Sequence, residues 1–266
     1  MAKNNSFIKL EGTLDGLTFY EKDGENFVKT KSTINKNRIQ NDPAFARTRE
    51  NMQEFGGAAK VGKAFREAFG SIVKLMGDTY IASRLAGAMK RINRNGAGLR
   101  GQRDFDIVGN ADLLVGFDFD EKTPLGAQFF APYDKPTLNA NRDVATWTVP
   151  DFNTDNFITK PEGATHCRLV LASGLLSNYQ WESALASYEP VNEDENSKGD
   201  VAYSADIPLQ GEVGAVTTLT VDLGIGAAVP ATVANLVSIG IIFYQEINGQ
   251  LYELASGNAM KLVVVG

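Results

Sequence analysis

Two Asp-Gly pairs near the start of the chain constrain its fold more than any other feature of the sequence. Asp15-Gly16 and Asp23-Gly24 divide the stretch 7–31 into three short runs that carry apolar residues. Asp-Gly is favoured at two-residue hairpin turns, because both central residues of such turns need a positive φ. The stretch therefore predicts a ribbon of three strands. A ribbon of this size is at best marginally stable in water by itself.

The ribbon consequently needs a surface outside itself, and the sequence leaves three surfaces open. These are the helices that follow, the C-terminal region and another copy of the chain. We favour another copy, because an exposed strand edge can pair with a neighbouring molecule. The residues expected to take part in self-association are Phe7, Ile8, Leu10, Leu14, Leu17, Phe19, Tyr20, Phe27, Phe55, Phe65 and Phe69.

Two helices are predicted after the ribbon. Asp42-Pro43 is a typical helix start, with a carboxylate that can cap the helix and a proline at its first position. Apolar residues between Phe45 and Met76 recur mostly at intervals of three, four or seven, as on the buried side of a helix. Four glycines between residues 56 and 70 interrupt this stripe. They indicate either a broken helix or close contact with a neighbour. The second helix is expected from about Thr79 to Asn93.

The character of the sequence changes near residue 103. The stretch 93–103 is basic and glycine-rich, which predicts a linker between a domain over 1–103 and a domain over 104–266. Beyond it, short apolar runs alternate with turn residues, as in antiparallel sandwiches of the immunoglobulin or fibronectin type III kind. We therefore expect an α+β chain. Its predicted C-terminal strands are 113–119, 144–149, 166–172, 203–209, 217–223, 236–247, 250–254 and 259–265.

Charge is divided unevenly between these two halves. Residues 1–103 carry 19 Lys and Arg against 10 Asp and Glu, a net +9, whereas residues 104–266 carry 7 against 22, a net −15. Such asymmetry indicates a polyanion-binding end or an electrostatic partner. Head-to-tail contact between copies would give an open polymer unless a ring closes. The alternative is that the two halves fold against each other.

A basic run ends the N-terminal half of the chain. It could contact phosphates without sequence preference, although no aromatic residue is interleaved and no nucleic-acid module is recognisable. The glycine pattern at 96–101 matches G-x-G-x-x-G, but a dinucleotide site needs a strand before it and a helix after it. We interpret that pattern as part of the linker. The basic run consists of Lys90, Arg91, Arg94, Arg100 and Arg103.

Residues that could carry catalysis or hold a metal are few. His166 and Cys167 are the only residues of their kind, and neighbours on a strand point to opposite faces, which argues against a Cys–His pair. No G-x-S-x-G elbow is present. The carboxylates at 118–121 and 193–195 lack the spacing of a calcium loop. We therefore expect no enzyme, no cofactor and no metal site, with Trp147 and Trp181 as core or interface anchors.

The start of the chain carries no recognisable targeting signal. MAKNNSFIKLEGT is polar and then strand-like, and no apolar run is long enough to span a bilayer. We expect synthesis in the cytoplasm, and leave an extracellular assembly or a virion open as the place of action.

Several stretches resemble a protein family of Bacteroidetes bacteria and their mobile elements. They are GTLDGLTFY (12–20), NDPAFARTRENMQEFGGAAKVGKAFRE (41–67), GATH (163–166) and IIFYQEINGQLYEL (241–254). The resemblance implies an N-terminal ribbon, a helical segment and a β-sandwich tail. Because that family has no assigned activity, it implies no site residues.

The leading hypothesis is a structural protein that assembles with itself, as a component of a filament, sheath or virion. It would polymerise through the ribbon, the helices and the oppositely charged halves. One alternative is a binding module whose sandwich recognises a glycan or a protein surface. Another is a nucleic-acid-associated protein of a mobile element or phage.

Overall fold

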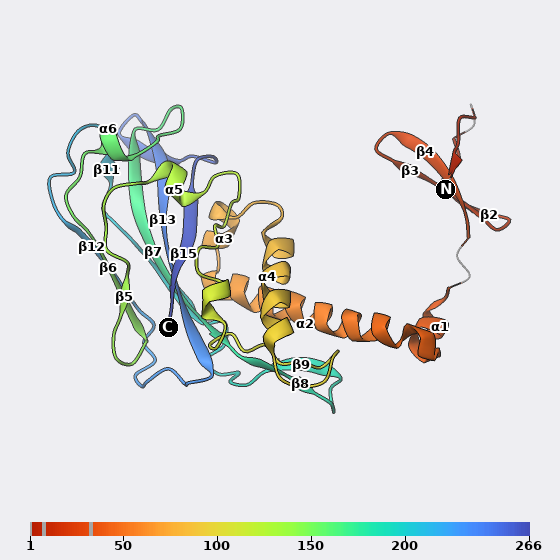
Figure 1. Cartoon of the computed structure of the whole chain (residues 1–266). Coiled ribbons are helices and arrows are strands. Elements are labelled where there is room, and N and C mark those ends of the chain that lie inside the picture. Colours follow the sequence, from red (N-terminus) through yellow and green to blue (C-terminus); the bar gives the residue numbers. More distant parts are fainter. Residues whose placement is uncertain (1, 7–8, 32–33) are drawn as a thin grey trace. The chain divides into compact units, whose positions relative to one another are not determined.

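The computed structural model describes residues 2–6, 9–31 and 34–266, and its elements are labelled in Figure 1. The chain is α+β: N-terminal strands precede helices, and large antiparallel sheets follow. It divides into two compact units, Met1–Glu50 and Asn51–Gly266. The boundary expected near residue 103 is therefore not where the units separate. The reason is that the helices after residue 51 share one apolar core with the C-terminal strands.

The first unit contains a four-stranded antiparallel sheet in the order β1-β4-β3-β2. Both Asp-Gly pairs form the expected turns, with φ of 42° and 81° at Asp15-Gly16 and of 54° and 76° at Asp23-Gly24. The two predicted hairpins are thus confirmed, and one short strand is added that the sequence did not predict. The strands are β1 (Ala2–Lys3), β2 (Gly12–Leu14), β3 (Leu17–Lys22) and β4 (Glu25–Thr30).

Helices occupy most of the stretch from residue 36 to residue 95. Asp42 caps a short 3₁₀ helix by accepting a hydrogen bond from the Ala44 N–H, as the sequence predicts. The long helix that follows continues through its interior glycines and ends before Gly70, which has a φ of 56°. In the described part of the chain, no helix is both long and apolar enough to cross a membrane. The helices are α1 (Lys36–Asn41), η1 (Pro43–Phe45), α2 (Ala46–Phe69), α3 (Ile72–Met76) and α4 (Ile81–Asn95).

The second unit has a layered, sandwich-like arrangement. The larger sheet has the order β10-β7-β13-β14, with β11 beside β7 and β15 beside β13, and the smaller sheet has the order β12-β6-β5. One face of the larger sheet packs against the smaller sheet, and helices lie on its other face (Figure 1). The strands are β5 (Thr137–Leu138), β6 (Val144–Val149), β7 (His166–Ser177), β10 (Gly199–Tyr203), β11 (Ile207–Pro208), β12 (Thr217–Asp222), β13 (Val233–Ile247), β14 (Gln250–Glu253) and β15 (Ala259–Val265).

Burial on both faces explains the sequence of the central strands. In β7 and β13 nearly every residue is buried, because one face meets the helices around Phe65 and the other meets the smaller sheet around Trp147. Such strands read as continuous apolar runs rather than as alternating ones. They therefore stand out in the sequence.

Two parts of the C-terminal region differ from expectation. The strand predicted at 113–119 is not formed: the 3₁₀ helix η2 (Ala111–Leu113) and Gly116, with a φ of 93°, occupy that stretch. Only a single β-bridge from Asp118 to Lys261 remains there. A hairpin of β8 (Tyr179–Glu182) and β9 (Ser187–Pro190) was not predicted. The short helices α5 (Leu125–Gln128) and α6 (Thr154–Phe157) complete the unit.

Candidate self-association site

The strand register of the N-terminal sheet sorts its side chains onto two faces. Leu14 is opposite Leu17, and Phe19 is opposite Val28. Directly opposed residues of antiparallel strands point to the same side, as do residues two apart on one strand. Leu14, Leu17, Phe19 and Val28 therefore lie together, and we call this set the apolar face of the sheet.

The opposite face is built differently. Tyr20 stacks on Phe27 with ring centroids 5.7 Å apart, and Lys29 Nζ lies 5.2 Å from the Tyr20 centroid. Lys3 Nζ and Glu25 Oε1 form an ion pair of 2.7 Å on this side. The two rings of this face thus contact each other and a cation. On the other face, the same register places Glu21, Asn26 and Thr30 beside the four apolar residues.

The apolar face has little cover within its own unit. None of the described residues between 2 and 50 is buried. Leu14 is 65% exposed and Leu17 is 43% exposed, while Phe19 and Val28 are half-buried. Contiguous exposed apolar surface of this kind is typical of a contact site for another protein. The N-terminal sheet therefore has no buried core within the described part of its own unit.

Not every residue of the predicted ribbon set lies on this face: Tyr20 and Phe27 belong to the opposite face. Phe7 and Ile8 lie outside the described residues. Leu10 is 42% exposed and precedes β2. Val28, in contrast, belongs to the face but was missing from the predicted set. The two-residue turn at Asp23-Gly24 fixes the register of β3 and β4, so this signal was available in the sequence.

The helical phenylalanines separate into core and surface. Phe65 and Phe69 are buried in the second unit, with ring centroids 5.0 Å apart, and Phe119 lies 5.3 Å from Phe69. Their expected part in self-association is therefore wrong, because their own chain already covers them. Apolar periodicity reports that a helix side is covered, but not by which molecule. Phe55, on the same helix, is 62% exposed.

Two members of the basic run are held in a buried ion cluster. The Glu54 carboxylate, which is buried, accepts hydrogen bonds from Lys90 Nζ, from Arg103 Nε at 2.8 Å and from the Gly101 N–H at 2.9 Å. Burial opposes ionisation of Glu54, but the hydrogen bonds from Arg103, Lys90 and Gly101 outweigh it and lower its pKa to about 2. Lys90 and Arg103 therefore do not belong to a free phosphate-binding patch.

The rest of the basic run lies on the surface of the second unit. Arg91 and Arg94 are exposed, and Arg100 donates to Asn51 Oδ1 at 3.2 Å. An ion pair of 2.5 Å between Lys60 and Glu189 joins the basic and acidic parts of the sequence within one chain. Residues 51–103 and 104–266 thus fold against each other, which was the alternative reading of the charge division.

His166 and Cys167 lie on opposite sides of β7, as expected. His166 Nδ1 lies 3.0 Å from Thr165 Oγ1 and is partly exposed. Cys167 lies in the core between the sheets, and burial raises the pKa of its thiol to about 12. Of the carboxylates considered for calcium, Asp118 lies 3.6 Å from Lys261 Nζ. Across the described ranges, no group of three or more His, Cys, Asp or Glu side chains could hold a metal ion.

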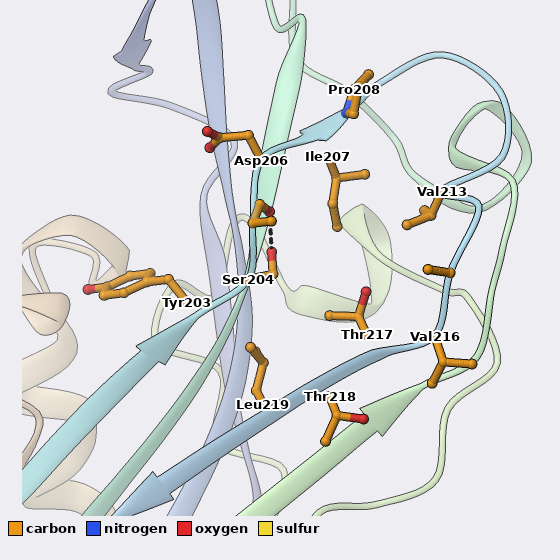
Figure 2. Close-up of a pocket in the computed structure, with 12 residues that line it drawn as sticks. Tyr203, Ser204, Asp206, Ile207, Pro208, Val213, Val216, Thr217, Thr218 and Leu219 are labelled. Carbon is orange, nitrogen blue, oxygen red and sulfur yellow. Dashed lines mark hydrogen bonds between the residues drawn. The ribbon is translucent and has the colours of Figure 1, made fainter.

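An open hollow lies between the two sheets of the sandwich. Figure 2 shows this hollow of about 410 Å³ between β10, β11 and β12, with Ile207 and Val213 pointing into it. Asp206 points away from it and pairs with Arg168 Nε at 2.5 Å. The Ser204 hydroxyl donates to the Ala205 carbonyl at 2.7 Å. The Asp206 and Ser204 side chains beside the hollow are thus bonded to groups of their own chain.

Comparison of the chain with protein-family models, with curated proteins and with solved structures finds no match in any of the three.

Proposed function

We propose that this chain is a structural protein that assembles with itself through the apolar face of its N-terminal sheet. The observation that carries the proposal is the combination of a regular four-stranded sheet with no buried residue among those described between 2 and 50. A sheet normally needs its apolar face covered to be stable in water.

A second copy of the chain provides a matching cover. Two apolar faces can stack about 10 Å apart, as the sheets of a sandwich do. Full burial of a leucine or phenylalanine side chain stabilises by about 1.5–3 kcal/mol. Because Leu14 and Leu17 are 65% and 43% exposed, each still has a large part of this stabilisation to gain. The edge strand β2, which pairs only with β3 among the described strands, adds backbone groups that a neighbour can bond.

Two adjacent residues of β3 provide a matched test. Leu17 lies on the apolar face, and Thr18 lies on the opposite face, where it pairs with Lys29. Leu17→Glu places a charge in the proposed contact and should abolish assembly, whereas Thr18→Glu places the same charge beside a lysine and should leave assembly intact. The assembly state of the full-length proteins is measured by light scattering after size-exclusion chromatography and by negative-stain electron microscopy.

Two results would overturn the proposal. The first is a wild-type chain that stays monomeric over a wide range of concentration. The second is equal loss of assembly in both variants, which would show that the apolar face has no special part. Far-ultraviolet circular dichroism of both variants establishes that the remainder of the chain is folded.

A further inference from the structure

The three glycines inside α2 differ in what surrounds them. A Cβ at Gly57 would collide with the Tyr188 ring and lie 2.8 Å from Phe105 Cε2, and a Cβ at Gly62 would lie 3.4 Å from Leu85 Cβ. At Gly56, no heavy atom of the described chain beyond its sequence neighbours and the adjacent backbone of α2 lies within 4 Å of the added carbon. Packing within the chain thus requires a glycine at position 57 and leaves an ordinary contact distance at Gly62, whereas Gly56 faces open space.

Gly56 belongs to an uncharged, exposed side of α2. Met52, Phe55, Gly56 and Ala59 stand at positions i, i+3, i+4 and i+7, which share one side of a helix. Met52 is 60% exposed and Phe55 is 62% exposed, and Gly56 and Ala59 are exposed as well. Lys60, which follows, is paired with Glu189. We call these four residues the outer side of α2; no uncompensated charge interrupts it.

The order of sizes along the outer side points to its partner. Two large residues, Met52 and Phe55, are followed by two small ones, Gly56 and Ala59. A rotation by 180° about the midpoint between Phe55 and Gly56 therefore places each large residue on a small one. If a second α2 lies antiparallel with a two-fold axis at that point, each Phe55 faces a Gly56 and each Met52 faces an Ala59. Large then meets small at every position, as ridges fit grooves in packed helices. Such self-complementarity is what an isologous contact requires.

A hollow beside the outer side has room for the incoming side chain. Met52, Gly56 and Trp181 are among the residues that line a space of about 290 Å³ between α2 and the β8–β9 hairpin. A cavity of about 150 Å³ is sufficient for a benzene ring in another protein. Trp181 packs edge to face on Tyr188, with centroids 5.2 Å apart. Phe55 of a second copy would thus enter a site with an aromatic wall.

We propose that α2 pairs with α2 of a second copy in this antiparallel, two-fold arrangement. The contact is distinct from the one through the N-terminal sheet, and it lies in the other compact unit. Its few residues offer less than the roughly 1,200 Å² that a stable interface buries. By itself the α2 pair is therefore weak. When two molecules are also joined through a second contact, the effective concentration of one α2 near the other rises, and a larger fraction of the α2 pairs forms.

Disulfide trapping tests the two-fold geometry in the full-length protein. Gly56→Cys places two thiols close to the axis, within the roughly 7 Å between Cα atoms that a disulfide tolerates. Lys63→Cys, equally on α2, places its thiols about 22 Å apart along the helix axis, so it serves as the matched control. Under mild oxidation, a covalent dimer is expected for Gly56→Cys and none for Lys63→Cys. Because the Cys167 thiol is buried, it should form no disulfide under these conditions.

Further experiments distinguish the α2 pair from the contact through the N-terminal sheet. The Gly56→Cys dimer should still form, at lower yield, when Leu17→Glu is also present, because the α2 contact does not include the N-terminal sheet. No dimer, or equal yields for both cysteine variants, would overturn the helix pair. A mixed disulfide between Phe19→Cys and Gly56→Cys chains, in place of the Gly56→Cys dimer, would also overturn it, because the N-terminal sheet would then occupy the outer side.

Gly56→Leu should change the Tm and the extent of assembly in opposite directions. The substitution improves helix propensity by about 1 kcal/mol at an exposed position, which corresponds to a rise in Tm of about 2–4 °C. In the proposed pair, the new side chain collides with Phe55 of the other copy. Assembly should therefore fall at least tenfold while Tm rises. A rise in Tm with unchanged assembly would show that Gly56 does not face a second copy.

Discussion

Replacing Glu54 by glutamine should destabilise the second unit in a manner that depends on pH. The Glu54 carboxylate is buried and accepts from Lys90, Arg103 and the Gly101 N–H, so it ties α2 to α4 and to the loop that follows α4. Glutamine keeps the shape of the side chain but removes its charge. Lys90 and Arg103 would then have no anion in a partly buried site, and one oxygen acceptor would be lost.

The size of the effect follows from the pKa of Glu54. Its ordinary value is 4.5, and in the folded chain it is about 2, a difference that corresponds to about 3 kcal/mol of stability. Because folding lowers this pKa, the stabilisation is complete above about pH 5 and is lost as the pH falls towards 2. Glu54→Gln should therefore cost about 3 kcal/mol at pH 7, or about 6–12 °C in Tm, and progressively less in acid.

Urea unfolding at pH 7, 5, 4 and 3 measures this difference. Both tryptophans, Trp147 and Trp181, lie in the second unit, so their fluorescence reports its unfolding. The control is Glu67→Gln on the same helix, because Glu67 forms an exposed ion pair of 3.2 Å with Lys63. Exposed pairs of this kind contribute less than about 1 kcal/mol. If Glu54→Gln destabilised equally at pH 7 and at pH 3, the ionised carboxylate would not be the cause.

Two further predictions concern salt and the single cysteine. If the apolar face drives assembly, 0.5–1 M salt should leave assembly unchanged or strengthen it, because screening weakens only charged contacts. Light scattering measures this. Dissociation at high salt would instead indicate that the oppositely charged halves hold the assembly together. Cys167 should not react with a thiol reagent at pH 8 until the protein unfolds, because burial raises the pKa of its thiol to about 12. The labelling is followed by absorbance. Rapid labelling of the native protein would contradict the place of Cys167 in the core.

Local signals were sufficient for much of the secondary structure. The Asp-Gly pairs placed both N-terminal hairpins, and the Asp42-Pro43 cap placed the start of η1. The predicted strands 144–149 and 259–265 coincide with β6 and β15. These features depend on torsional preferences and on burial patterns of a few consecutive residues, which the sequence displays directly.

Longer-range features could not be predicted in the same way. The sequence showed an apolar stripe on α2, but only the fold shows that Phe65 is core and that Phe55 is surface. No local pattern marks Glu54 as buried, because its partners Lys90 and Arg103 come from distant positions. The candidate site was predicted in part: the hairpins were evident, whereas Val28 was left out of the predicted set although the Asp23-Gly24 turn fixes its register.

By itself the sequence determined the turns, the start of η1, most strands of the sandwich and the two hairpins of the N-terminal sheet. The tertiary structure decided where the chain divides, which apolar residues that division leaves exposed, and which charges are neutralised within the chain. The physical reason is that turns and caps depend on neighbours along the backbone. Burial and ion pairing depend on which distant segments meet, and no local pattern records that choice.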